Sequence, residues 1–321
     1  MVNRAVSNSR PRRQRGVALI TVLLVFALVA VIAAGMLHRS QLTLRSVSSL
    51  VETRQAYYYA LAGEAFARQI LARDIIDGHG QVDSLLEAWA RTKDQPPFEI
   101  EGGSIQLEIH DLQGRFNLNS VVDVQGIPRQ DGLDQFRRLL AALQLNANYA
   151  AEWQDWVDRD QQRSPNGAED ADYPDYRTPG HPEADISALR LLHSMQPQDY
   201  AKLAPHVTVL PVSDALINVN TADAAVLRAL SPIINESRAA QIEAKQQSGG
   251  FRDVAEFQAL TGSSDIPAAV ATSFFEIVVT VNYADRWQRV RTVLQRSNNS
   301  GAVAFTVISR VRSPLIDDIE L

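Results

Sequence analysis

An apolar stretch close to the N-terminus constrains this chain most. From residue 17 to residue 37, only Thr21 and Gly35 are not clearly apolar. In a helix these 21 residues, at about 1.5 Å each, span the roughly 30 Å hydrocarbon core of a bilayer. Residues 1–16 carry five arginines and no acidic residue, and such a flank stays in the cytoplasm. The sequence therefore predicts a single-pass membrane helix whose C-terminal side is exported.

A secretory signal peptide has a similar layout, with a basic segment before an apolar one. However, the apolar run here is longer than the about 7 to 15 residues of a signal peptide, and no Ala-x-Ala-like exit follows it. No proline occurs between Leu37 and Pro96, and apolar residues recur at spacings of three and four from residue 38 to residue 77. We therefore expect one continuous helix from Val17 to Asp77, with its second half packed on a domain.

The charge and composition of the exported part exclude several kinds of site. Without the five arginines of residues 1–16, the 31 basic residues fall to 26, against 37 acidic ones. An acidic surface does not favour nucleic acid or anionic lipid. The absence of cysteine excludes disulfides, thiol catalysis and cysteine metal sites. Bound calcium is then one way to hold long loops in place.

The order of expected strands predicts an α+β fold with an insertion. A hairpin is expected at residues 98–110 around Gly102-Gly103, and further strands only at residues 274–283, 287–295 and 304–311. The residues between them have mainly helical spacing. We expect a long N-terminal helix packed on an antiparallel β-sheet, with a large, mainly α-helical domain inserted in the sheet. The expected boundaries are 38–111 for the helix and first strands, 112–271 for the inserted domain, and 272–321 for the final strands.

The inserted domain contains a short sequence pattern that occurs twice. Residues 116–120 and 217–221 share an apolar-Asn-apolar-Asn-hydroxyl pattern, and a helical stretch follows each. One interpretation is that these polar residues cap ordinary helices. The second copy, with Gly249-Gly250 further on, is also similar to helix-hairpin-helix or SAM-like modules, whose backbone amides often bind DNA phosphates. The acidic residues around these glycines disfavour the DNA interpretation.

An acidic stretch is the candidate binding site. It brings six carboxylates into 18 residues on both sides of an Asn-Gly pair: Asp155, Asp158, Asp160, Glu169, Asp170 and Asp172. Calcium takes six to eight oxygen ligands from a flexible backbone, so these six residues are candidate calcium ligands. The spacing departs from the EF-hand, and a solvated acidic loop or catalytic carboxylates remain as alternatives. Paired acids alone are a weak signal for hydrolysis.

Motifs for catalysis are missing. The sequence has no Gly-x-Ser-x-Gly elbow, His-Glu-x-x-His pair, phosphate-binding loop or dinucleotide-binding glycine pattern. The six histidines are scattered, and none pairs at the spacing of metal ligands. We therefore expect a protein that is not an enzyme and has no catalytic residues.

The N-terminus carries a family resemblance. Arg13-Gln14-Arg15-Gly16 followed by Val17-Ala18-Leu19-Ile20 resembles the signal of type IV prepilin-class proteins. The resemblance implies that a prepilin peptidase removes residues 1–16, cutting after Gly16, and methylates the new amine of Val17. It also implies that residues 17–37 first anchor the protein in the inner membrane and then pack with neighbouring helices in a fibre.

The rest of the chain narrows the resemblance. Most members carry glutamate at the fifth mature position, where this chain has Thr21. In the family that glutamate is thought to pair with the neighbour nearer the tip, so Thr21 suits a first subunit. The combination of Thr21 and the large insert with residues 55–60, 114–119 and 218–221 and the acidic stretch is similar to the K-type minor pseudopilin (GspK) family of type II secretion.

That resemblance implies a function and a set of partners. The expected role is at the tip of a periplasmic pseudopilus that supports export of folded proteins across the outer membrane. The expected partners are the I-type and J-type minor pseudopilins, the major pseudopilin and the prepilin peptidase, with secreted substrates or the outer-membrane channel as further contacts. The expected location is the inner membrane, with the N-terminus cytoplasmic and the C-terminal domain periplasmic. A minor pilin of a type IV or DNA-uptake pilus, with nucleic-acid contacts, is the alternative.

Overall fold

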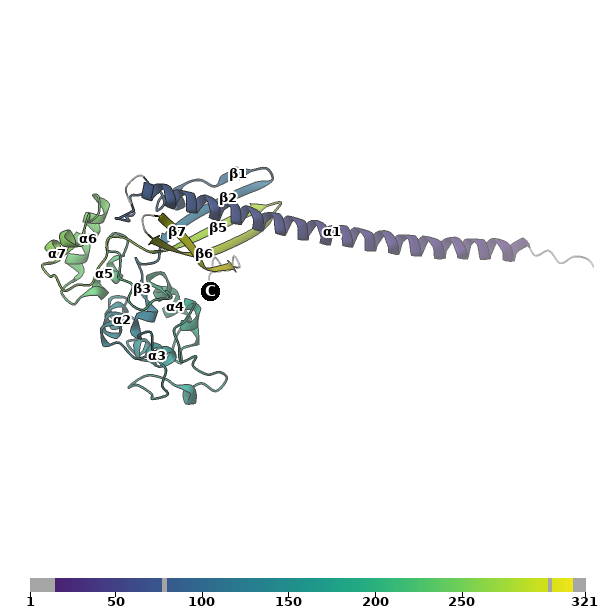
Figure 1. The fold of residues 1–321 in the computed structure, drawn as a ribbon. Coiled ribbons are helices and arrows are strands. Elements are labelled where there is room, and N and C mark those ends of the chain that lie inside the picture. Colours follow the sequence, from purple (N-terminus) through teal and green to yellow (C-terminus); the bar gives the residue numbers. More distant parts are fainter. Residues whose placement is uncertain (1–14, 77–79, 300–301, 314–321) are drawn as a thin grey trace, which may run out of the picture. The chain divides into compact units, whose positions relative to one another are not determined.

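The computed structural model describes residues 15–76, 80–299 and 302–313 (Figure 1). The chain divides into two compact units, residues 1–55 and residues 56–321. The described part of the first unit is the N-terminal portion of helix α1 (Arg15–Ile76), and the expected leader up to Gln14 lies outside the described residues. Helix α1 alone, among the described helices, is long and apolar enough to cross a membrane. Its apolar side chains from Leu19 to Leu37 are exposed, as in a helix that faces lipid.

The continuous helix expected from the sequence is confirmed up to Ile76, and Asp77 lies outside the described residues. Within the second unit, α1 buries a row of small side chains, Ala56, Ala60 and Ala67, that recur at helical spacing. Gly63 lies on the same side, where an added Cβ would come within 2.7 Å of Val279. Small residues therefore let the helix backbone approach the sheet closely.

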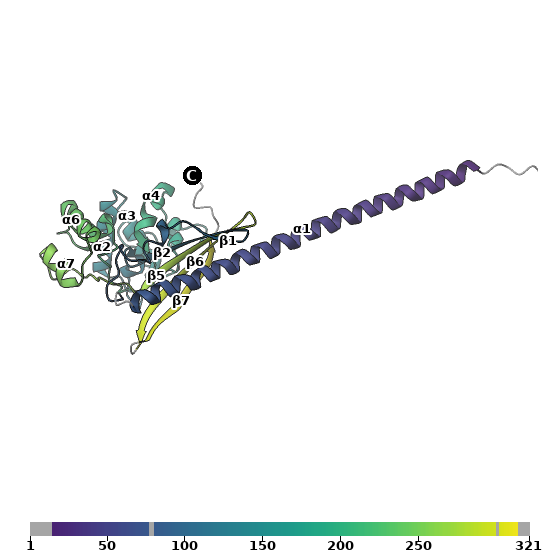
Figure 2. The same cartoon turned by 90° about the horizontal axis from the view of Figure 1, so that it is seen from above.

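The sheet of the second unit has five antiparallel strands in the order β1-β2-β5-β6-β7. They are β1 (Phe98–Ile100), β2 (Gly103–Asp111), β5 (Phe274–Tyr283), β6 (Arg286–Asn299) and β7 (Ala302–Ser313). These strands confirm the expected hairpin around Gly102-Gly103 and the three expected C-terminal strands. The C-terminal part of α1 runs across one face of this sheet (Figure 2).

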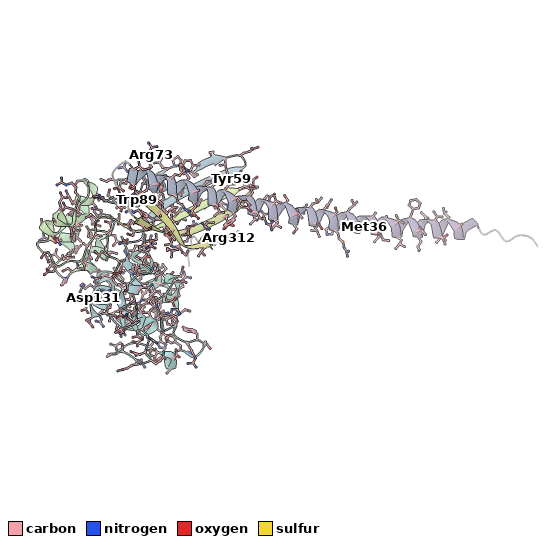
Figure 3. All side chains as sticks on the ribbon, viewed as in Figure 1. Met36, Tyr59, Arg73, Trp89, Asp131 and Arg312 are labelled. Carbon is pink, nitrogen blue, oxygen red and sulfur yellow. The ribbon has the colours of Figure 1, made fainter. Side chains whose placement is uncertain are left out.

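The core between α1 and the sheet combines the small helix residues with large apolar strand residues such as Ile277 and Val279. Trp89, from the segment after α1, lies close to the C-terminal end of that helix (Figure 3). It is buried, and its ring packs edge-on against that of Phe275 with 5.4 Å between ring centroids. At the other end of this face, the guanidinium of Arg312 lies 3.9 Å from the ring centroid of Tyr57. The last strand is thus attached to the helix.

The elements between β2 and β5 form the inserted, mainly helical domain, so the expected α+β fold class is confirmed. After η1 (Thr92–Asp94), which precedes the sheet, they are β3 (Phe116–Asn117), η2 (Leu118–Val121), α2 (Gln130–Ala142), α3 (Asn148–Val157), η3 (Asp170–Asp172), η4 (Ile186–Leu191), α4 (Pro197–Leu203), η5 (Ala204–His206), β4 (Val207–Thr208), α5 (Ala224–Leu230), α6 (Glu236–Gln247) and α7 (Val254–Thr261). Strands β3 and β4 pair in parallel as a separate small sheet. The domain has its own core, which includes Phe136, Trp153 and Phe257.

The two Asn-x-Asn segments have matching roles in this domain. Asn119 accepts a hydrogen bond from the backbone N of Glu183 at 3.0 Å and donates one to its O at 2.9 Å. Asn220 likewise accepts from the backbone N of Phe251 at 2.6 Å and donates to its O at 2.9 Å. The expectation that the residues at the end of each pattern cap α2 and α5 is wrong, because Arg129 and Asp223 occupy those N-cap positions. Asn117, earlier in the first pattern, caps the short helix η2. The side-chain amides of Asn119 and Asn220 instead each bind the backbone of a distant loop, at Glu183 and at Phe251.

Candidate metal centre

The acidic residues of the candidate site enter from two sides. Asp155 lies in the last turn of α3, whose apolar residues Trp153 and Trp156 are buried, and Asp158 terminates that helix as its C-cap. The chain then forms a loop that contains Asp160 and returns at Glu169, the N-cap of η3. Helix termination and the return of this loop bring residues of both segments face to face.

Three carboxylates form the centre of the site. Asp158, Asp160 and Glu169 each offer an oxygen atom within 4.8 Å of the others. Asp155 lies beside them. Three of these four residues are buried: Asp155 is 0% exposed, Asp158 1% and Glu169 4%. Among the described residues, one oxygen of each of these three is buried without a hydrogen-bond partner: Oδ1 of Asp155, Oδ1 of Asp158 and Oε1 of Glu169. Buried carboxylate oxygens without partners are costly, so this arrangement calls for a cation.

The remaining two predicted ligands are engaged elsewhere. Asp170 accepts hydrogen bonds from Arg177 Nη1 at 2.7 Å and from the backbone N of Thr178 at 2.8 Å. Asp172 accepts from Arg163 Nη1 at 3.0 Å and from the backbone N of Glu169 at 3.0 Å. These two acids hold the loop's shape, whereas Asp155, Asp158, Asp160 and Glu169 face the cluster.

The pKa values of the central acids follow from their burial. Burial, with the charges of Asp160 and Asp155, raises the pKa of Asp158 to about 6. Burial also raises the pKa of Glu169 to about 7, together with the charge of Asp155 and the other acids around it. By contrast, the hydrogen bond from Arg177 lowers the pKa of Asp170. The central acids are therefore held together against their mutual repulsion.

Gly167 leaves room for the carboxylate of Asp155 at the turn beside the cluster. A Cβ on Gly167 would lie only 1.9 Å from Oδ2 of Asp155, so the carboxylate rests on the glycine itself. The same Oδ2 accepts a hydrogen bond from the backbone N of Ser164 at 3.0 Å. Asn166 occupies the left-handed region with a φ of 65°. The Asn-Gly pair thus lets the chain turn tightly around the Asp155 carboxylate.

The donor set identifies the kind of cation that the residues fit. The ligand atoms that Asp158, Asp160 and Glu169 offer are carboxylate oxygens, which suit hard cations such as calcium and magnesium. Calcium tolerates an irregular oxygen cage, whereas magnesium demands near-ideal octahedral geometry and retains several waters. The orphaned oxygens and the elevated pKa values therefore fit a calcium ion held by Asp158, Asp160 and Glu169, with Asp155 at its side.

A second group of acids was missed by the sequence analysis. Asp74, Asp83 and Glu87 also bring carboxylate oxygens within 4.8 Å of one another. Here Arg296 of β6 donates to the buried carboxylate of Asp83, from Nη1 at 3.0 Å, and so supplies the positive charge. No short-range sequence pattern could have revealed the ion pair between Asp83 and Arg296, because the two residues are 213 positions apart.

The residues of the expected processing site lie in helix α1. Gly16 and Val17 are part of the first turns of α1, and nothing in their local secondary structure departs from a helix. The hydroxyl of Thr21 donates a hydrogen bond to the backbone O of Ala18 at 2.9 Å. A hydroxyl that bonds to its own helix is compatible with lipid.

Comparisons with known proteins agree with this architecture. Two family models, both described as "Type II secretion system (T2SS), protein K", match residues 114–212 and 217–277. A protein of Pseudomonas aeruginosa named type II secretion system protein K is 38% identical over 307 residues, which cover 90% of each chain. The chain belongs to the type II secretion system protein K family. A Klebsiella pneumoniae protein of the same name is 33% identical over 331 residues, covering 93% of this chain and 96% of that one.

A solved structure supports the fold of this protein K family member. It is the crystal structure of the GspK-GspI-GspJ complex from the type 2 secretion system of enterotoxigenic Escherichia coli, and the match has a TM-score of 0.71 at 23% identity. It covers 84% of this chain and 99% of that one. The expected resemblance to a K-type minor pseudopilin is therefore confirmed, and the alternative of a type IV or DNA-uptake pilus subunit is not supported.

The glycine turn of the helix-hairpin-helix-like segment is also unsuited to phosphate. The backbone N of Gly250 donates to Lys245 O at 2.9 Å, and that of Phe251 to Asn220 Oδ1 at 2.6 Å. The next amide, of Arg252, donates to Glu256 Oε2 at 3.0 Å. These amides are engaged within the protein K chain, so they are not available to a DNA backbone.

Proposed function

We propose that this protein K family member is the subunit that caps the tip of a type II secretion pseudopilus. The observation that carries the proposal is the helical domain between β2 and β5, which adds about as much mass to the pseudopilin sheet as the sheet and helix themselves contain. A subunit with such an insertion is too bulky to be followed by another subunit in a closely packed fibre. The same domain would face secreted substrates or the outer-membrane channel.

The solved relative was crystallised in a complex named GspK-GspI-GspJ, and this supports the I-type and J-type minor pseudopilins as partners of this chain. The test is co-purification of this chain with its own I-type and J-type homologues, followed by mass determination of the complex. We expect one copy of each subunit. A stable complex with several copies of this chain would contradict capping, because a cap occurs once per fibre.

The N-terminal helix supports an inner-membrane anchor with the N-terminus in the cytoplasm and residues 56–321 in the periplasm. We propose that the prepilin peptidase cuts after Gly16 and methylates Val17. Mass spectrometry of the N-terminus, with and without the peptidase, tests this. We expect N-methylated Val17 only with the peptidase, and a Gly16→Val variant that keeps its leader. A mature N-terminus elsewhere would overturn the processing site.

Thr21 supports the first position in the fibre. A glutamate there would need a partner in the subunit above it, whereas the Thr21 hydroxyl is bonded to Ala18 O in its own helix. We expect Thr21→Ser to assemble normally and Thr21→Glu to initiate fewer fibres, as counted by electron microscopy of sheared pseudopili. Equal fibre numbers for both variants would contradict this role of Thr21.

We also propose that the chain has no catalytic activity. The acids of the candidate centre support a structural role, because Asp170 and Asp172 shape the loop through arginines. The other acids face one another with little room for a substrate, since the side chains of Asp155, Asp158 and Glu169 are buried.

We propose calcium as the ion that the acidic cluster binds. The supporting observation is the set of three buried, unpartnered carboxylate oxygens on Asp155, Asp158 and Glu169. Terbium, a luminescent stand-in for calcium, offers a direct assay because Trp156 lies one residue from Asp155 in α3 and can sensitise its emission. Isothermal titration with calcium and magnesium then gives the affinities.

Two substitutions sharpen this test. We expect Asp158→Asn to abolish terbium emission and calcium binding, because it removes a charged ligand at the centre of the cluster. Asp170→Asn is the matched control, since Asp170 is engaged by Arg177 and Thr178 and should leave calcium affinity within about threefold. Absence of binding by the unmodified chain, or equal losses in the two variants, would overturn the assignment.

A further inference from the structure

The turn beside the acidic cluster contains the one Asn-Gly pair of the sequence, Asn166-Gly167. Asparagine followed by glycine is prone to deamidation, because glycine has no side chain to hinder attack by its own backbone nitrogen on the asparagine carboxamide. A chain can usually avoid this liability by placing another residue after asparagine. Here any other residue in place of Gly167 would have to displace the buried carboxylate of Asp155, since a Cβ would lie 1.9 Å from Asp155 Oδ2. The cluster geometry therefore fixes a chemically labile pair in the chain.

The side chain of Asn166 is exposed, whereas Gly167 is buried. The backbone N of Gly167 donates a hydrogen bond to Ser164 O at 2.9 Å, and the φ of Asn166 is 65°. The nitrogen that would attack is thus directed to Ser164. In the closed turn, this hydrogen bond withholds the nucleophile from the carboxamide of Asn166.

The turn is attached to Asp155 of the acidic cluster and to Gln154 of α3, and a further hydrogen bond lies within it. Ser164 N donates to Asp155 Oδ2 at 3.0 Å, and Gln154 Nε2 donates to Ser164 Oγ at 2.8 Å. Arg163 Nε donates to Gly167 O at 2.9 Å. Repulsion among Asp155 and its neighbouring carboxylates opposes this closed arrangement, and a bound cation would remove that repulsion. A cation in the cluster would therefore make opening of the turn less frequent.

We propose that Asn166 is a site of spontaneous deamidation that is protected when a divalent cation occupies the acidic cluster; this rests on the calcium binding proposed above. When the turn opens, the nitrogen of Gly167 loses its proton and attacks Cγ of Asn166. The Cγ–Nδ2 bond then breaks, and Nδ2 takes up a proton and leaves as ammonia. Water then opens the resulting five-membered succinimide at either carbonyl. The products are aspartate or isoaspartate at position 166, with no change in oxidation state.

The products would alter the cluster in two ways. Both add a negative charge to a loop in which Asp158 and Glu169 already repel each other. Isoaspartate also inserts an extra carbon into the backbone between Ser164 and Glu169, which displaces Glu169 relative to α3. A chain that has lost its cation for long enough would therefore lose the ability to bind it again. The fraction of deamidated chains would therefore increase with the time that the chain spends without the ion.

The test uses the full-length chain in detergent at a mildly alkaline pH and a series of free calcium concentrations. Trypsin releases residues 164–177 as one peptide, because Arg163 and Arg177 flank it. Mass spectrometry of this peptide gives the fraction deamidated over time. Calorimetry on the same preparation gives the dissociation constant for calcium independently. Protein in urea gives the rate for the open chain, and Asn166→Gln shows any mass gain that arises outside position 166.

If only the open turn deamidates and only the closed turn binds calcium, the rate falls by the factor 1 + [Ca]/Kd. At a calcium concentration one hundred times Kd, we expect deamidation about a hundredfold slower than in chelator. If the deamidation rate is independent of calcium in a preparation that binds calcium, protection of Asn166 by the cation is wrong, although the metal centre stands. Absence of calcium binding would overturn the metal centre itself. A turn that stays unmodified in chelator, while the urea control deamidates, would also overturn the proposal.

Discussion

The guanidinium of Arg310 in β7 forms a two-point hydrogen bond with the buried carboxylate of Glu64 in α1. Nε donates to Oε2 at 2.7 Å and Nη2 donates to Oε1 at 2.8 Å. Thr292 Oγ1 in β6 adds a third hydrogen bond at 2.9 Å. Bidentate contacts between guanidinium and carboxylate fix orientation as well as distance. The last strand of the sheet is thereby held on the helix that continues into the membrane span.

Replacement of Arg310 by alanine tests this attachment. We expect the free energy of unfolding to fall by about 2 kcal/mol, below the about 3 to 5 kcal/mol of a fully buried pair, because Arg310 is partly exposed. Urea unfolding of residues 39–321 measures the change. Arg137→Ala is the matched control, since Arg137 pairs with Asp134 on the surface and should cost less than about 1 kcal/mol. Equal losses in the two variants would contradict a special role for Arg310.

The pair formed by Glu64 and Arg310 also predicts how the free energy of unfolding depends on pH. Burial raises the pKa of Glu64, but hydrogen bonds from Arg310, Thr292 and Arg68 outweigh it and hold the pKa below 4.5. A lowered pKa in the folded state contributes stability that is present above the unfolded value and lost as the pH falls below it. The free energy of unfolding, measured between pH 7 and pH 3, should therefore fall less on acidification in Arg310→Ala than in the unmodified chain.

Gly63 predicts a steric effect that reverses the usual preference of helices. Alanine normally stabilises a helix by about 1 kcal/mol relative to glycine, but a Cβ at residue 63 would lie 2.7 Å from Cγ1 of Val279. We expect Gly63→Ala to destabilise residues 39–321 by about 1 to 3 kcal/mol, because the well-packed sheet must shift. In a Val279→Ala background the same change should be neutral or stabilising. Failure of Val279→Ala to rescue Gly63→Ala would show that the close approach is not the cause.

The cation centre predicts a second pH dependence, of opposite sign. Burial and nearby acids raise the pKa of Asp158 to about 6 and that of Glu169 to about 7 in the folded chain without metal. The folded state then binds more protons than the unfolded state, so stability in chelator falls as the pH rises from about 4.5 to 7. Calcium needs deprotonated ligands, so the rise in melting temperature on adding calcium should be larger at pH 7.5 than at pH 5.5. An equal rise at both pH values would argue against these two acids as ligands.

The long elements of this fold were predictable from local patterns. The helix of residues 17–76 follows from apolar residues at helical spacing without an intervening proline, and β5 begins at Phe274 and ends at Tyr283, as its alternation predicts. The insertion follows from the gap between Asp111 and Phe274, since both must join one sheet. Periodicity and order were sufficient because each element is long or strongly patterned.

Contacts between distant residues were not predictable in this way. Asn119 and Asn220 were interpreted as caps, but they hold the backbones of Glu183 and Phe251, which are 64 and 31 residues further on. The acidic stretch pointed to a region in which Asp158, Asp160 and Glu169 come together. Its spacing could not show that Arg177 engages Asp170, because that choice depends on how the loop returns. Side-chain partners are decided by tertiary packing, which a single sequence does not encode in short-range patterns.

The central claim is that this subunit occupies the tip of the pseudopilus. The most direct measurement is labelling of a single introduced tag on this chain in isolated pseudopili, followed by electron microscopy. We predict one label for each fibre, at one end, and a label on the major pseudopilin along the whole shaft as the control. Labels of this chain at intervals along the shaft would contradict the claim.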